Sequence, residues 1–144
     1  MMKKGKGGFT LIEIVITIAI IAVLISAVSV GTGIMGAAKM NTAAQSVKQL
    51  RVAAQSYIAA GNLTFTGISI AGLITSKFLP DGFVAAASNP WAGDYTVAVN
   101  SGDSSKVDIT LTSVPADSAT RLSALFKNSA STTSYTGTTW IVTF

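Results

Sequence analysis

Gly8-Phe9-Thr10-Leu11-Ile12-Glu13 stands directly before an uncharged stretch of twenty-five residues that runs from Ile14 to Ala38. The twenty residues from Leu11 to Val30 would form a helix of about 30 Å, which matches the thickness of the hydrocarbon core of a bilayer. A charge at membrane depth costs about 2.5–3.5 kcal/mol on insertion scales. We therefore expect the carboxylate of Glu13 to have a partner or a function that compensates for this cost.

The basic character of the chain comes mainly from its first eight residues. The net charge is +4, and Lys3, Lys4 and Lys6 supply three of the ten basic side chains. Without residues 1–8, seven basic side chains face six acidic ones, so the charge indicates no nucleic-acid surface. Basic residues before an apolar segment favour a cytoplasmic N-terminus and a single-pass orientation.

Composition excludes several kinds of active site. The 144 residues contain no cysteine and no histidine, so disulfides and Ser-His-Asp catalysis are impossible. The acidic residues from Asp81 to Asp117 lack the paired spacing of an acid–base site, and Asn100–Asp103 lacks the carboxylate density of a calcium loop. The sequence predicts no enzyme, no metal site and no cofactor. Trp91 is expected to pack on its own domain rather than bind a sugar.

A secretory signal peptide is the alternative interpretation of the apolar segment. Ala27-Val28-Ser29 has the small residues of a cleavage site. However, the helical pattern continues to about Ala60, and the first proline is Pro80. Glu13 would also have no role in a peptide that is discarded. We therefore expect one long helix in place of a cleaved signal.

The second half of this helix, residues 31–60, is amphipathic. Its apolar residues are spaced three and four apart, and Gly61-Asn62 provides a stop signal. The predicted core-facing stripe consists of Met40, Ala43, Val47, Leu50, Ala54 and Tyr57, widened by Ala44 and Ile58. Gly31, Gly33 and Gly36 lie between the two halves. They are consistent either with close helix packing or with a segment that melts during assembly, because each glycine costs about 1 kcal/mol relative to alanine.

The remainder, residues 61–144, is predicted to be a globular α+β head. Helices are expected over Ser69–Phe78 and Ala116–Lys127, the latter with a stripe of Ala119, Leu122, Leu125 and Phe126. Tyr95–Val99 and Val107–Leu111 alternate as a hairpin, and Thr138–Phe144 reads as a strand. Ser129–Thr139 is interpreted as a surface loop. The expected fold class is a long N-terminal helix packed on a small, mainly antiparallel β-sheet.

The N-terminal residues resemble the processing site of type IV pilins and the related pseudopilins. Glycine stands before the expected cut, phenylalanine after it, and glutamate at the fifth mature position. The resemblance implies a leader of residues 1–8, removal of this leader by prepilin peptidase between Gly8 and Phe9, and N-methylation of Phe9. It also implies a transmembrane half over residues 9–30 and a role for Glu13 in subunit register.

The resemblance further implies the partners and the location of the protein. The precursor would wait in the inner membrane, and the pilus assembly machinery would then add it to a helical homopolymer at the cell surface. Asn89-Pro90-Trp91-Ala92-Gly93 and Val114-Pro115 look like the heads of small type IVb pilins, whereas the leader looks like that of type IVa pilins. The alternatives are a type II secretion pseudopilin, a minor pilin, or a membrane-anchored protein with an extracytoplasmic binding head.

Overall fold

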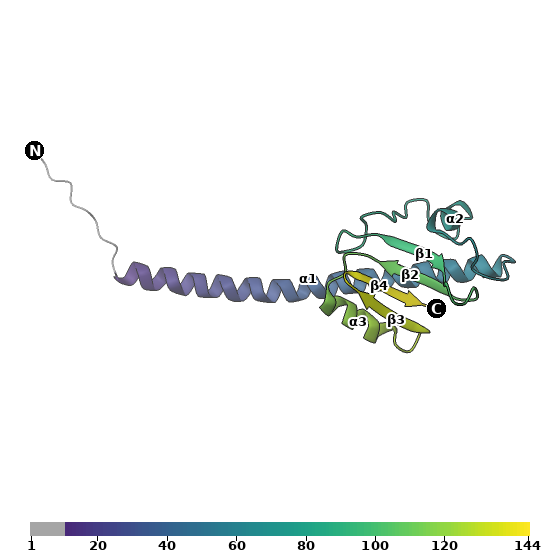
Figure 1. The fold of residues 1–144 in the computed structure, drawn as a ribbon. Helices are drawn as coiled ribbons and strands as arrows, with labels where there is room; N and C mark the ends of the chain where they lie inside the picture. The colour runs from purple at the N-terminus through teal and green to yellow at the C-terminus, as the bar shows by residue number, and fades with distance from the viewer. Residues whose placement is uncertain (1–10) are drawn as a thin grey trace, which may run out of the picture. The chain divides into compact units, whose positions relative to one another are not determined.

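The computed structural model describes residues 11–144, apart from the side chains of residues 23–34. The elements follow in the order α1 (Leu11–Ala59), α2 (Ile70–Thr75), β1 (Tyr95–Val99), β2 (Val107–Leu111), α3 (Ala116–Phe126), β3 (Thr132–Thr136) and β4 (Thr139–Thr143) (Figure 1). They belong to two compact units, one ending at Ala37 and the other formed by Ala38–Phe144. The predicted α+β class with a long N-terminal helix is confirmed.

The part of α1 in the second unit packs its apolar stripe into the core of the head. Ala43, Val47, Leu50 and Ala54 are buried, as predicted, and Met40, Tyr57 and Ile58 pack against them while remaining partly exposed. Ala53, which the spacing argument omitted, is buried as well. The helix ends where Gly61 adopts a φ of 104°, a conformation that favours glycine.

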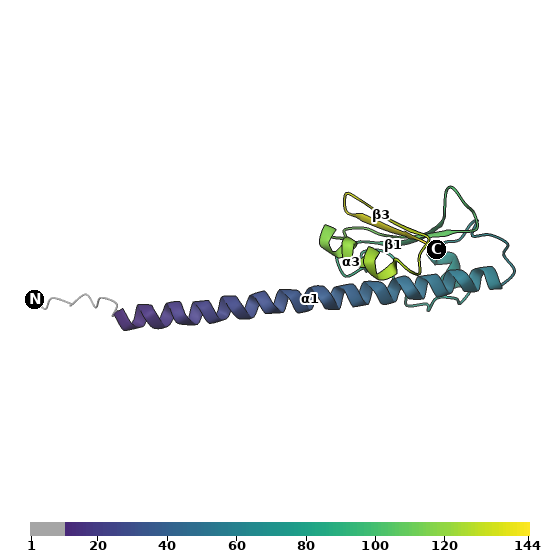
Figure 2. The same ribbon diagram turned by 90° about the horizontal axis from the view of Figure 1, so that it is seen from below.

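The four strands form one antiparallel sheet in the order β1-β2-β4-β3. Side chains alternate across it, and the residues of one face are buried: Tyr95, Val97, Val107, Ile109, Leu111, Trp140 and Val142. Figure 2 shows α3 and the C-terminal part of α1 on the same side of the sheet. The core of the head therefore lies between this face and the two helices, and the opposite face carries mainly threonine and serine.

The short elements agree with the sequence except at three places. The helix predicted over Ser69–Phe78 is shorter, because α2 ends at Thr75 and Lys77 adopts a φ of 60°. The hairpin of β1 and β2 has the predicted bounds, and Ser69 caps α2 by accepting a hydrogen bond from the backbone N–H of Gly72 at 3.1 Å. Leu125 was wrongly placed in the stripe of α3, because it is 54% exposed while Ala119, Leu122 and Phe126 are buried. Its position lies beyond the apolar arc that the other three define.

The interpretation of Ser129–Thr139 as a loop is wrong, because this segment contains strand β3. Its side chains alternate between exposed and half-buried positions, and it pairs with β4 along its whole length. The polarity of threonine, serine and tyrosine indicates a loop when the sequence is considered alone. Threonine and tyrosine also favour strands, and here pairing with β4 decides the outcome.

The Asn89–Gly93 loop is organised by a buried amide. The side-chain oxygen of Asn89 accepts the backbone N–H groups of Trp91 and Gly93, each at 2.9 Å, and its side-chain nitrogen donates to the carbonyl of Thr112 at 2.7 Å. Trp91 is partly buried and packs on the core of the head, as predicted. These bonds join the loop to the end of β2.

Gly93→Ala should destabilise the head by about 2 kcal/mol or more, because the new methyl group cannot be accommodated. A Cβ at this position would lie 2.1 Å from the backbone oxygen of Thr112, whereas a Cβ at Gly82 would meet nothing within 4 Å. Thermal unfolding of the full chain in detergent measures the effect. Gly82→Ala is the matched control and should change the free energy of unfolding by less than about 0.5 kcal/mol. Equal stability of the two variants would contradict the close approach.

Trp140→Ala should cost about 3–5 kcal/mol of stability, because it leaves a cavity in the centre of the core. Trp140 is fully buried, its ring centroid lies 5.9 Å from that of Phe126, and its indole nitrogen donates to Ser123 at 2.9 Å. Chemical unfolding in detergent, with the exposed Leu125→Ala as control, measures the difference. A variant as stable as the control would show that β4 is not central to the core.

Candidate functional site

The N-terminal motif lies partly outside the described residues. Gly8 and Phe9, the predicted cleavage and methylation positions, belong to the part that the structure does not describe. Glu13 lies in α1, close to the first described residue of the helix. Gly31, Gly33 and Gly36 lie within α1, which is helical from Leu11 to Ala59. A Cβ on Gly36 would meet nothing within 4 Å.

The first turns of α1 present apolar side chains around the whole helix. Residues 11–22 are all exposed, and Leu11, the most open of the large apolar residues among them, is 81% exposed. Thr17 does not interrupt this surface, because its hydroxyl donates to the backbone oxygen of Glu13 at 2.7 Å. A shallow hollow of about 290 Å³ is lined by Glu13, Ile14, Thr17 and Ile18. Such a surface requires lipid or other protein to cover it.

The predicted transmembrane half, residues 9–30, begins before the described residues, and the side chains of its residues 23–30 are not described. Among the residues whose side chains are described, no helix contains an apolar stretch of the length that a membrane crossing needs.

The head carries an apolar groove that the sequence did not reveal. It has a volume of about 470 Å³ and is lined by Gln55, Ile58, Ala59, Leu63, Phe65 and Ser105. Leu63 is 97% exposed although it is a large apolar residue. The available signal was a leucine within the polar turn that follows α1. Isolated apolar residues in loops are common, however, and the groove arises only when the β1–β2 turn approaches the end of α1.

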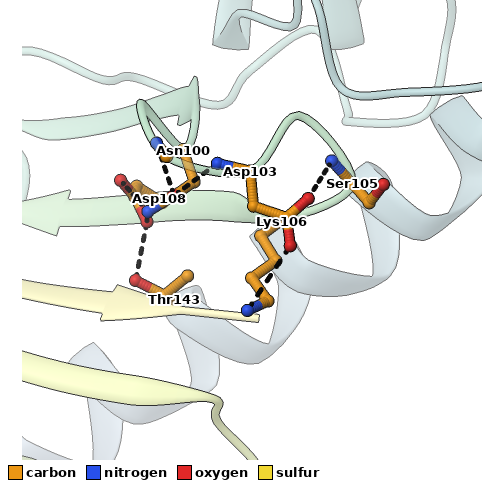
Figure 3. Close-up of polar contacts among 7 residues, drawn as sticks. Asn100, Asp103, Ser105, Lys106, Asp108 and Thr143 are labelled. Atoms are coloured by element: carbon orange, nitrogen blue, oxygen red, sulfur yellow. Dashed lines mark hydrogen bonds and ion pairs between the residues drawn. The ribbon is translucent and has the colours of Figure 1, made fainter.

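The β1–β2 turn contains a network of polar side chains (Figure 3). Asp108 accepts hydrogen bonds from the side-chain nitrogen of Asn100 at 3.0 and 3.1 Å and from the Thr143 hydroxyl at 2.7 Å. The backbone N–H of Ser105 donates to Asp103 and, together with Lys106 at 3.5 Å, holds the pKa of the Asp103 carboxyl below its ordinary value. The network links the turn to the end of β4.

The polar side chains of this turn hold its backbone in place. The side-chain oxygen of Asn100 accepts the backbone N–H groups of Gly102 and Asp103, so the predicted turn is closed by its own side chain. Within the described part of the chain, no three histidine, cysteine, aspartate or glutamate residues gather as metal ligands would. Among the functional positions predicted from the sequence, Glu13 is the one whose neighbouring side chains are described. It lies within the exposed apolar surface of α1.

Comparison with known families accounts for both parts of the chain. Residues 3–29 match the prokaryotic N-terminal methylation motif, and residues 35–143 match the PilS N-terminal family. Neither the curated proteins nor the solved structures contain a match. The PilS match covers well over half of the chain and includes the helix-and-sheet head. The chain therefore belongs to the PilS N-terminal family and is a type IV pilin-like protein.

Proposed function

We propose that this protein is the structural subunit of a type IV pilus. The observation that carries the proposal is the apolar surface of residues 11–22, which is exposed on all sides of α1 and contains one acidic residue, Glu13. A folded head joined in sequence to such a helix suits a protein that exchanges one apolar environment, the membrane, for another, the centre of a filament. The match to the methylation motif supports the same function.

Processing would convert the membrane precursor into an assembling subunit. Prepilin peptidase cuts between Gly8 and Phe9 on the cytoplasmic side and methylates the new amine of Phe9. The loss of Lys3, Lys4 and Lys6 removes the charges that hold the N-terminus in the cytoplasm. The subunit, until then in the inner membrane, becomes able to leave it, and the pilus assembly machinery adds it to the growing surface filament.

The amine of Phe9 and the carboxylate of Glu13 would pair between neighbouring subunits. Each charge is costly in an apolar surrounding, and together they compensate for one another. A buried pair of this kind contributes more to register than to net stability, because its Coulombic gain is largely offset by desolvation. An uncut leader prevents the pairing, since the nitrogen of Phe9 is then an amide. Cleavage thereby becomes the switch for polymerisation.

Gly31, Gly33 and Gly36 would form the segment of α1 that unwinds when helices pack together in the filament. Three glycines lower the cost of opening the helix by about 3 kcal/mol relative to three alanines. A Cβ at Gly36 would meet nothing within 4 Å, so close packing within the subunit does not explain the glycine at this position.

A pilus subunit is favoured over a type II secretion pseudopilin by the C-terminal part of the head. The resemblance associates pseudopilins with an acidic, calcium-binding loop there, and this chain has no acidic residue after Asp117. Electron microscopy of cells that overproduce the protein distinguishes the candidates. Long surface fibres identify a major pilin, and short periplasmic rods a pseudopilin. A protein present at few copies in fibres built from another subunit is a minor pilin.

Mass spectrometry of sheared surface fibres should find an N-methylated peptide that begins at Phe9. Gly8→Leu should leave the lysine-bearing start intact and abolish the fibres, because it replaces the glycine that the processing motif has before the cut. The matched control Gly7→Leu should be processed. Fibres that contain the uncut chain would contradict the proposed switch.

Glu13→Leu should reduce fibre yield by at least about tenfold, because the amine of Phe9 then lies in an apolar surrounding without a partner. Glu13→Gln should behave similarly, whereas Ile16→Leu on the same helix should assemble normally. Immunoblots of sheared material, compared with the membrane fraction, measure the yield. Normal fibres from Glu13→Leu would show that register is set elsewhere.

A further inference from the structure

Strand β3 is an open edge of the sheet. The order β1-β2-β4-β3 leaves β3 paired on one side only, and Figure 1 shows it at the border of the sheet. In the described part of the chain, the backbone hydrogen bonds of Thr132–Thr136 are confined to the ladder with β4. At the other edge of the sheet, the start of β1 is covered, because the N–H of Tyr95 donates to the carbonyl of Ala85 at 2.8 Å.

Strand β3 itself contains no charged residue, no proline and no bulge, which are features that often protect an edge strand. Soluble proteins keep open edges apart with lysine, proline, bulges or covering segments. The chain carries no charged side chain after Lys127 and no proline after Pro115. The register with β4 runs from Thr132 to Thr136 without a bulge. A strand with these properties can accept another strand.

We propose that β3 pairs with β3 of a second copy of this chain, in antiparallel orientation. Pairing centred on Ser134 places Thr132 opposite Thr136 and Ser134 opposite its own counterpart, so all five residues are used. The two uncharged edges are self-complementary because no like charges face each other. The half-buried Thr133 and Tyr135 would lie opposite one another on the face that already packs inward.

The symmetry of this contact determines which copies it joins. An antiparallel pairing of identical strands has a twofold axis, and it closes after two copies. Subunits of one polar filament are related by rotation and translation along the axis, and none of them is related to another by a twofold. The inference rests on the proposed pilus function, and its consequence is that β3 joins subunits of two different filaments. The contact would therefore pair filaments side by side.

A charge at Ser134 should separate the paired filaments. Ser134 is exposed at the centre of the proposed contact, so Ser134→Lys places two like charges at directly opposed positions. The fraction of laterally paired filaments in electron micrographs should fall about tenfold, because the repulsion repeats at every contact along both filaments. Thr96→Lys is the matched control, as this exposed threonine lies on β1, away from the β3 edge. It should leave the pairing unchanged.

Mixing variants tests whether the partner is a second copy. Purified Ser134→Lys and Ser134→Glu filaments should each remain single, and an equal mixture should pair again. Failure of the mixture to pair would overturn the proposal and indicate that a peptide of another protein occupies the edge. Single wild-type filaments, or pairing that persists in both variants, would also overturn it. An absence of any filament overturns the proposed function and this inference together.

Discussion

The constraint on which the structure depends is that the first turns of α1 expose apolar surface on every side. A helix satisfies its own backbone hydrogen bonds, so such a segment is stable in an apolar surrounding, and its side chains alone decide where it can reside. Twelve consecutive exposed residues, with Glu13 the one charged side chain among them, do not suit water. We infer that lipid covers them before assembly and the same segment of other copies covers them afterwards.

In the proposed function, the head remains folded while the first turns of α1 change their surroundings. The second half of α1 is part of the hydrophobic core of the head. Val47 and Leu50 are fully buried beside β2 and β4 residues such as Ile109 and Trp140. The polar network of Asn100, Asp108 and Thr143 connects the β1–β2 turn to the end of β4 without a disulfide. Residues 38–144 form a compact unit of their own.

Much of this architecture could be predicted because it follows from local periodicity. The stripe from Ala43 to Ala54 and the β1–β2 hairpin have spacings that only one kind of element satisfies. Strand β3 could not be predicted because its five residues are all polar and show no alternation of apolar and polar side chains. These residues form a strand because they pair with β4. The groove beside Leu63 was missed for a similar reason, since its walls come from segments forty residues apart. Sequence located the candidate assembly residues through their motif, but interfaces between copies have no local signature.

The central claim is that the amine of Phe9 neutralises Glu13 of a neighbouring copy. A filament structure determined by electron microscopy at side-chain resolution tests it most directly. The account predicts that the nitrogen of Phe9 lies within about 4 Å of a carboxylate oxygen of Glu13 in an adjacent subunit. A filament in which the two groups of neighbouring subunits lie far apart, with each turned toward its own chain or toward water, would contradict it.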